Sequence, residues 1–446
     1  MTISPPFPAH PNVHRKPRVL AGREKSAMGK FLALCLLACA TLSAQQASNP
    51  TELPGRPFHI AKTWVIGGEG DWDYLTADPK AGQLFIAHGS VVQVVDLQSG
   101  TVAGQVDGLR QPRAIALDET GQFGYISDTR AGEVAVFDRR SFRVTARIRV
   151  ASTPRLLAYD SVNKLLFAVA YIPPPEKVTH RVVRRDASGR AQVTYVSDPV
   201  ADRNAAEAAN NLPTPVEVID TETQTLVGRL LFSGRIDSAL CDGMGGLFLG
   251  VVNRSYVLRV DTQTVAAQLP SQAGADRPTL NWSDVESGEV ARAAWAAPDH
   301  PRIYFLDSAC TEPRALAVDG HLGRLYAACN NMKLTVWNFE HGELVASVPL
   351  NTPPDSLAYD PDRGLLYVAS GVGSLTIVRR DATDSYAVVQ VLPTRQRART
   401  MALDQDTGEV FLVSNALGVD LRTPGGIGKL KEVPVPGSFQ VLVIQN

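Results

Sequence analysis

The chain has 446 residues, of which 44 are Lys or Arg, 45 are Asp or Glu, and 44% are hydrophobic. This composition is too apolar and too weakly charged for a disordered chain, and too near neutral for nucleic-acid binding through bulk charge. With 35 Gly, 30 Pro and 5 Cys, the chain is neither collagen-like nor a small disulfide scaffold. Its length suggests two or three ordinary domains unless the chain is built from repeats.

The N-terminal region has the pattern of a secretory signal peptide. Lys30 leads into an apolar run over residues 31–42, and Ser43-Ala44-Gln45 follow it. The run is too short to remain in a bilayer as a spanning helix. We therefore expect a signal peptide at 28–44, a linker at 45–57, and export to the periplasm, the cell surface or the medium. Residues 1–27 are an extension or follow from a start assigned too early, because Met28 begins a more ordinary signal peptide.

A lipid anchor is the alternative to simple cleavage. Leu36-Leu37-Ala38-Cys39 resembles a bacterial lipobox, which would leave a lipid on Cys39. Leu37 suits that pattern poorly, so we favour cleavage without a lipid. No later segment has about 18 consecutive apolar residues, and we expect no transmembrane anchor.

One short pattern recurs seven times: a charged residue, an apolar strand-like run and a terminal Asp. A turn rich in Gly, Asn or Asp follows each copy, then a β-rich run such as residues 365–370. Third and fourth strands complete most copies, and four strands about every 40 residues are typical of a propeller blade. The copies begin and end at Asp73 and Asp78, Arg113 and Asp118, Arg155 and Asp160, Asp237 and Asp242, Arg314 and Asp319, Asp355 and Asp360, and Arg399 and Asp404.

The predicted fold class is therefore all-β, a seven-bladed β-propeller of four-stranded antiparallel blades over residues 58–446. Two intervals between copies are about twice as long as the others, which indicates insertions at about 172–212 and 270–309, unless the second hides an eighth blade. The last copy lacks an outer strand, and the strand-like run 58–66 precedes the first copy. Pairing this run with the last blade closes the ring and removes exposed edges.

The repeats resemble the YVTN family of β-propeller proteins, close to its exported YncE-like group. The resemblance covers most of residues 58–446 and is strongest over 310–331, 355–360 and 397–404. It implies the propeller fold and a location outside the cytoplasm, and it carries no agreed catalytic residues.

The first residues of the seven copies form a candidate ligand-binding site. In a propeller the innermost strands line a central channel, so equivalent positions project around one ring at its mouth. The planar fork of arginine matches carboxylates and phosphates, so the ring can hold a small anionic ligand. The alternative, which we favour, is a structural network in which crowded opposite charges pair. This ring consists of Asp73, Arg113, Arg155, Asp237, Arg314, Asp355 and Arg399.

Other polar positions repeat as well. The terminal Asp residues are expected to fix turns, because Asp accepts hydrogen bonds from nearby turn N–H groups. The loops after the second strands are expected on the face of the ring, and a binding role for any one of their residues is a hypothesis. These loops carry His88, Asp128, Tyr171, Asn253, Asn330 and Asn415.

Two cysteines are predicted to form a disulfide. Cys310 precedes a first strand, and Cys329 ends the antiparallel second strand of the same blade, so the two are neighbours. Export permits the bond, which would contribute about 3 kcal/mol. Cys241 lies inside a strand and is predicted to be a buried free thiol.

The insertions are the least generic parts of the chain. The first begins at Pro173-Pro174-Pro175 and reads as a hairpin of residues 177–185 and 190–196. Partner binding and solvated loop decoration are both open for these segments. The first carries Arg181, Arg184, Arg185 and Arg190 as a basic patch, and the second carries Trp282, Trp295 and His300.

Catalytic signatures are missing from the sequence, including Gly-x-Ser-x-Gly, phosphate-binding loops, His-Glu-x-x-His and haem-attachment motifs. We expect no cofactor and no metal, and a monomeric, non-enzymatic exported scaffold that binds an unknown protein or a small anionic ligand. The alternative is an enzyme with its site at the channel mouth. It would be a lactonase-like hydrolase with metal at Asp73, Asp237 and Asp355, or a quinoprotein-type dehydrogenase component.

Overall fold

The computed structural model describes residues 56–173, 179–185, 191–210, 212–269, 277–283, 301–306, 308–420 and 431–446. The expected signal peptide, the lipobox and nearly all of the expected linker lie outside these residues. Among the described residues, no helix is long and apolar enough to cross a membrane.

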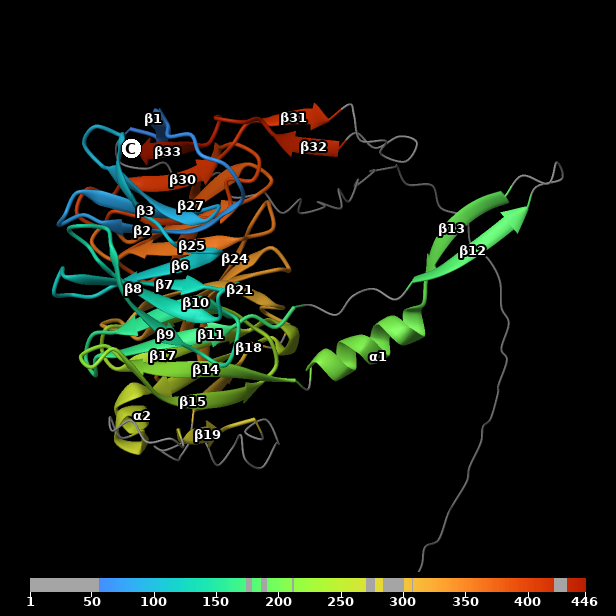
Figure 1. Cartoon of the computed structure of the whole chain (residues 1–446), viewed down its shortest axis with the longest axis horizontal. Coiled ribbons are helices and arrows are strands. Elements are labelled where there is room, and N and C mark those ends of the chain that lie inside the picture. Colours follow the sequence, from blue (N-terminus) through green and yellow to red (C-terminus); the bar gives the residue numbers. More distant parts are fainter. Residues whose placement is uncertain are drawn as a thin grey trace, which may run out of the picture. The chain divides into compact units, whose positions relative to one another are not determined.

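Sheets of four or five strands form the blades of a propeller (Figure 1). Chain order is also the order from the innermost to the outermost strand in the first two blades. Blade one contains β2 (Trp72–Asp78), β3 (Gln83–His88), β4 (Val91–Asp96) and β5 (Val102–Val106). Blade two contains β6 (Pro112–Leu117), β7 (Phe123–Asp128), β8 (Glu133–Asp138) and β9 (Val144–Arg149).

The next four blades follow the same plan, with a fifth strand added to blade three. Blade three contains β10 (Pro154–Asp160), β11 (Leu165–Ala170), β14 (Pro213–Asp220), β15 (Thr225–Ser233) and β19 (Thr279–Asn281). Blade four contains β16 (Ile236–Cys241), β17 (Gly246–Val251), β18 (Tyr256–Asp261) and β20 (Arg302–Phe305). Blade five contains β21 (Pro313–Asp319), β22 (Arg324–Cys329), β23 (Lys333–Asn338) and β24 (Glu343–Pro349). Blade six contains β25 (Ser356–Asp360), β26 (Leu365–Ser370), β27 (Ser374–Arg380) and β28 (Tyr386–Pro393).

Blade seven is built from both ends of the described chain. The strand β1 (His59–Val65) pairs antiparallel with β33 (Gln440–Gln445) and is the outer strand of the sheet, beside β33 in Figure 1. Phe58 fastens this strand to blade six, because its N–H donates to Gln390 Oε1 at 2.8 Å and its carbonyl accepts from Gln390 Nε2 at 2.7 Å. The predicted closure is confirmed. Blade seven contains β29 (Met401–Leu403), β30 (Val410–Ser414), β33 (Gln440–Gln445) and β1 (His59–Val65).

The inner strands close a ring of seven blades. Each of β2, β6, β10, β16, β21, β25 and β29 contacts the inner strands of both neighbouring blades, and β29 meets β2. Each long interval between repeats is therefore a single blade with an insertion, and the second holds no eighth blade among the described sheets.

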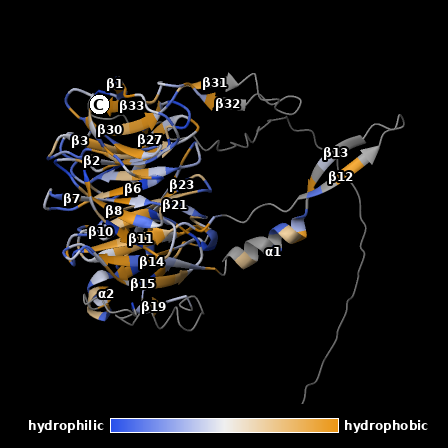
Figure 2. Cartoon of the chain, in the orientation of Figure 1, coloured by the Kyte–Doolittle hydropathy of each residue, from blue (hydrophilic) through white to orange (hydrophobic). Residues whose placement is uncertain are grey.

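The hydrophobic core lies between neighbouring blades, and the blade strands are strongly apolar (Figure 2). Side chains alternate across a strand, so each blade presents apolar residues on both faces. In β3, Leu84 and Ile86 pack toward blade seven, whereas Phe85 and Ala87 pack toward blade two.

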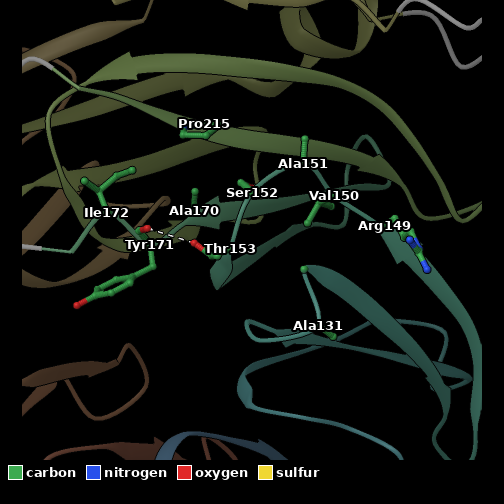
Figure 3. Close-up of a pocket in the computed structure, with 11 residues that line it drawn as sticks. Ala131, Arg149, Val150, Ala151, Ser152, Thr153, Ala170, Tyr171, Ile172 and Pro215 are labelled. Carbon is green, nitrogen blue, oxygen red and sulfur yellow. Dashed lines mark hydrogen bonds between the residues drawn. The ribbon is translucent and has the colours of Figure 1, made fainter.

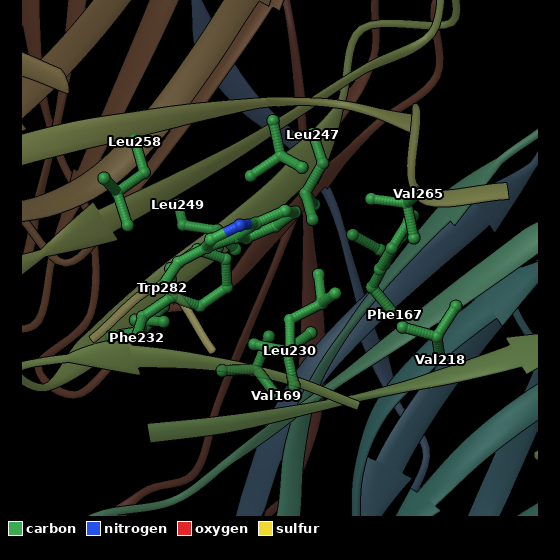
Figure 4. Packing of buried hydrophobic residues seen from close by; sticks show 14 of the residues in the cluster. Phe167, Val169, Val218, Leu230, Phe232, Leu247, Leu249, Leu258, Val265 and Trp282 are labelled. Atoms are coloured by element: carbon green, nitrogen blue, oxygen red, sulfur yellow. The ribbon is translucent and has the colours of Figure 1, made fainter. Parts of the chain in front are cut away.

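The largest core cluster lies between blades three and four and includes Trp282 from the second insertion (Figure 4). Trp282 is 7% exposed, and its ring centroid lies 5.6 Å from that of Phe232. The flanking strand β19 pairs in parallel with β15. This part of the insertion is core rather than solvated decoration.

The expected boundaries of the second insertion also need correction. The strand β20, within the range 270–309, is the outer strand of blade four. The short helices η1 (Val252–Arg254) and α2 (Thr262–Gln268) precede the insertion, and the Asp261 carboxylate caps α2 by accepting from Thr264 N. Trp295 and His300 lie outside the described residues.

The first insertion contains the predicted hairpin and a helix that was not predicted. The strands β12 (Thr179–Arg185) and β13 (Ala191–Ser197) pair antiparallel, and α1 (Pro199–Asn210) follows. Asp198 caps α1 by accepting from Val200 N and Ala201 N, each at 3.0 Å. A second hairpin, β31 (Leu417–Asp420) with β32 (Lys431–Pro434), was also not predicted. Arg190 of the predicted basic patch lies outside the described residues.

The predicted disulfide is present. Cys310 and Cys329 are bonded with a Cα–Cα distance of 5.3 Å, and both are fully buried. The bond ties the segment before β21 to the end of β22. Cys241 is a free thiol as predicted, but it is half-buried rather than buried, and desolvation raises its pKa.

We expect reduction of the Cys310–Cys329 bond to lower the free energy of unfolding by about 3 kcal/mol, since the open loop gains entropy in the unfolded chain. Denaturant unfolding with and without reductant measures the difference. The matched control is the double variant Cys310→Ser and Cys329→Ser, in which reductant should have no effect. Equal stability of the oxidised and reduced wild-type protein would contradict the prediction.

Candidate functional site

The ring residues meet at the mouth of the central channel. Each lies at or just before the start of an inner strand, and these strands begin at the same end of the channel. All of the ring residues except Arg113 line one cavity of about 200 Å³, together with Tyr74 and Thr400. Arg113 is ion-paired to a member of that set, Asp73.

Most of these charges pair with one another. Arg113 Nη1 donates to Asp73 Oδ2 at 3.0 Å. Asp237 accepts from Arg155 Nη1 at 3.2 Å and from Arg314 Nη1 at 3.3 Å, so it links blades three, four and five. Arg314 Nη2 also lies 3.3 Å from Glu312 Oε2. This part of the ring is a structural charge network.

Asp355 and Arg399 do not join that network. The Oδ2 atom of Asp355 accepts from Gly371 N at 2.6 Å. A Cβ atom on Gly371 would lie 3.2 Å from Asp355 Oδ2 and 3.4 Å from Arg399 Cβ, so this backbone packs against both residues. Within the described part of the chain, the Arg399 guanidinium makes no hydrogen bond or ion pair. At the mouth, the N–H donors of the Arg399 guanidinium therefore have no acceptor among the described residues.

Thr400 adds an unpartnered hydroxyl beside that arginine. Its side chain is 6% exposed, and its Oγ1 atom has no hydrogen-bond partner among the residues that the structure describes. A buried hydroxyl without a partner is costly, so Thr400 is a candidate hydrogen-bonding group for a molecule in this cavity. Tyr74 lines the same cavity, and desolvation raises the pKa of its phenol.

Sequence reasoning missed Thr400 and Tyr74. Both directly follow a ring residue in the repeat, whereas the same position is Ala114 or Leu156 in other blades. The position is also polar at Ser238 and Ser356, so the repeat gave no signal that singled out Tyr74 and Thr400.

Burial sets the electrostatics of the ring. Desolvation raises the pKa of Asp73, and the nearby Arg155, Arg113 and Arg399 guanidiniums oppose that shift. Burial also disfavours the charge of Arg155, but Tyr74 and the ring carboxylates overcome this and raise its pKa. The Arg155 guanidinium lies 5.1 Å from the centroid of the Tyr171 ring, a cation–π contact.

The loops after the second strands are mainly structural. Asp128 is buried and accepts from Arg110 N at 2.7 Å and Gln111 N at 2.8 Å. Asn253 Oδ1 accepts from Arg235 N at 2.7 Å, and Asn330 N donates to the Thr311 and Glu312 carbonyls.

His88 and Asn415 are buried, whereas Tyr171 is exposed. His88 Nδ1 lies 2.8 Å from Gln93 Oε1, the His88 ring packs on Phe439, and desolvation lowers the pKa of the imidazole. Asn415 Oδ1 has no partner among the described residues. Tyr171 is 37% exposed and is the member of this set that contacts the ring.

Tyr171 also lines a larger hollow between blades two and three (Figure 3). Its volume is about 560 Å³, and Ile172 and Pro215, which flank the first insertion, form part of its wall. Thr153 Oγ1 donates to the Tyr171 carbonyl at 3.3 Å. Arg149 is the charged side chain of the lining, so the hollow offers few groups that could orient a ligand.

The terminal Asp residues lie at the opposite end of the inner strands, where the turns to the second strands begin. In every blade, the terminal Asp side chain accepts a backbone N–H from the turn that follows, which agrees with the predicted turn role. Among the described residues, no group of three His, Cys, Asp or Glu side chains is arranged to hold a metal ion.

Comparison with known proteins supports the fold class. No protein-family model matches the sequence, and no curated protein is significantly similar to it. A chain in the crystal structure of a mitotic checkpoint complex is 13% identical, with a TM-score of 0.53 over 89% of this chain and 95% of that one. A chain of hydrazine synthase from Kuenenia stuttgartiensis is 16% identical, with a TM-score of 0.52 over 82% and 95%. At these identities the likeness shows the fold alone, a seven-bladed β-propeller.

We expect Asp73 to titrate above its ordinary pKa of 3.8. This carboxyl then favours folding most below its unfolded pKa, and the contribution is lost as the pH rises through the native value. Arg155→Gln should raise the native pKa further, because it removes a nearby positive charge. Carboxyl-carbon NMR titration measures both values.

The matched control for this titration is Arg140→Gln. Arg140 is exposed in the turn after β8, at the other end of the blade. A native pKa of Asp73 at or below 3.8, or equal shifts in the two variants, would show that the stated electrostatics are wrong.

Proposed function

We propose that this chain is an exported, non-enzymatic propeller of the YVTN type that binds a small anionic ligand at its channel mouth. The observation that carries the proposal is Arg399, whose open guanidinium adjoins the unpartnered Thr400 hydroxyl at a cavity of about 200 Å³. Carboxylate and phosphate oxygens accept hydrogen bonds from both groups.

The distribution of charges favours an anion over a cation. Asp73 and Asp237 are ion-paired with arginines, and Asp355 accepts a backbone N–H. The acids of the ring therefore already have donors, whereas Arg399 has no acceptor among the described residues. Hydrogen bonds to a charged group contribute about 1.5–3 kcal/mol each, enough for a weak, selective site.

Export and the family assignment are part of the same proposal. The basic start and short apolar run before residue 45 support export, as does a structural disulfide, which persists in oxidising compartments. The repeated motif and the seven blades support the YVTN assignment. We propose a monomer whose ligand site is complete within one chain.

We expect Arg399→Gln to weaken binding of acetate and inorganic phosphate by about tenfold or more, because it removes a charge-assisted hydrogen bond. NMR titration of the mature protein, followed at the Arg399 and Thr400 amides, measures the affinity. Arg140→Gln, in the turn after β8 of blade two, is the control and should bind as the wild type does. If neither anion shifts these amides, or if both variants bind equally, the mouth is not an anion site.

A further inference from the structure

The channel continues below the mouth as a second cavity, whose wall combines apolar side chains with polar ones such as Thr76, Ser238 and Ser356. Its volume is about 210 Å³. Tyr74, Asp237, Arg314 and Asp355 line both cavities, so the two are continuous. Residues from several blades form the apolar wall, among them Leu75, Ile115, Leu157, Leu316, Leu357 and Met401.

Blade seven carries the polar and apolar features in sequence order. Arg399 presents the open guanidinium, Thr400 the unpartnered hydroxyl, and Met401 belongs to the apolar wall. Three consecutive residues therefore lead from a cationic entrance, past a hydroxyl group, to the apolar part of the cavity wall. A ligand that satisfies all three has a charged acceptor at one end and hydrocarbon at the other.

The depth of the apolar section limits the hydrocarbon. In the inner strands, lining residues extend up to three positions beyond the ring, as from Asp237 to Leu240. At about 3.3 Å per residue, this is at most about 10 Å. With carbon–carbon bonds of about 1.5 Å, a staggered chain of about six to eight carbons spans it.

From these features we infer that the channel binds an organic acid with an unbranched apolar tail, its carboxylate at Arg399 and Thr400 and its tail toward Met401. The inference rests on the proposed anion site and specifies its ligand class. The two acids that line both cavities already have donors, because Asp237 is paired with Arg155 and Arg314 and Asp355 accepts from Gly371 N.

Titration calorimetry of the mature protein with acetate, butyrate and octanoate tests the inference. Each buried methylene contributes about a fourfold gain in affinity when it leaves water. We therefore expect octanoate to bind at least tenfold more tightly than butyrate. Arg399→Gln should weaken binding of all three acids, and Met401→Gln should remove most of the dependence on chain length while acetate binding persists.

A matched variant controls for general effects of the substitution. Met244 is 56% exposed in the turn after β16, so Met244→Gln should leave octanoate binding unchanged. Methionine methyl NMR adds a readout on the wild-type chain that needs no variant to fold: octanoate should shift the Met401 methyl signal and leave that of Met244 in place.

Each outcome has a distinct meaning. Binding that depends on Arg399 but not on chain length overturns this inference and leaves the anion site standing. Failure of all three acids to bind overturns both. Octanoate binding that is equal in the wild type and Arg399→Gln shows non-specific apolar association and also overturns the inference.

Discussion

The structure depends on the burial of both faces of every blade. Each core cluster is made of residues from two neighbouring sheets, as where Phe85 and Ala87 pack against blade two while Leu84 and Ile86 pack against blade seven. A single four-stranded sheet with two apolar faces cannot leave either one in water. The blades are therefore stable only as a closed set. The pairing of β1 with β33 completes blade seven with the segment that leads into blade one, and β29 meets β2.

Closure also accounts for the different character of the two ends of the channel. At one end, the carboxylate of each terminal Asp accepts a backbone N–H from its own turn. Arg139 also forms ion pairs with Asp78 and Asp118 of adjacent blades. Such contacts fix the blades and leave little for a ligand. At the other end, the inner strands begin close to the axis, so charged side chains from different blades must share a small space. Hydrogen bonding is uneven there, because Asp73 and Asp237 are ion-paired whereas the Arg399 guanidinium has no partner among the described residues.

The repeat made the blades and the ring predictable. The positions of Asp73, Arg155 and Asp237 followed from alignment of the copies, because equivalent residues in a closed propeller occupy equivalent places. The helix α1 was missed, although Asp198 followed by Pro199 is a typical helix start. The strand β19 could not be predicted, since a three-residue strand in parallel pairing with the preceding blade carries no periodic signal.

The alignment of the copies could not predict which ring side chains form ion pairs, because that depends on distances of a few ångströms between their charged atoms. Counting charges gives four arginines and three aspartates, and such a set permits either a closed network or an open site. Asp355 and Arg399 both precede their strands by a residue or more, outside the regular ladder, and Gly371 draws the Asp355 carboxylate to its own N–H. This hydrogen bond forms within blade six, and it gives the Asp355 carboxylate a donor other than Arg399. The neighbouring Arg399 guanidinium of blade seven is therefore left without an acceptor among the described residues, although a carboxylate lies beside it at the channel mouth.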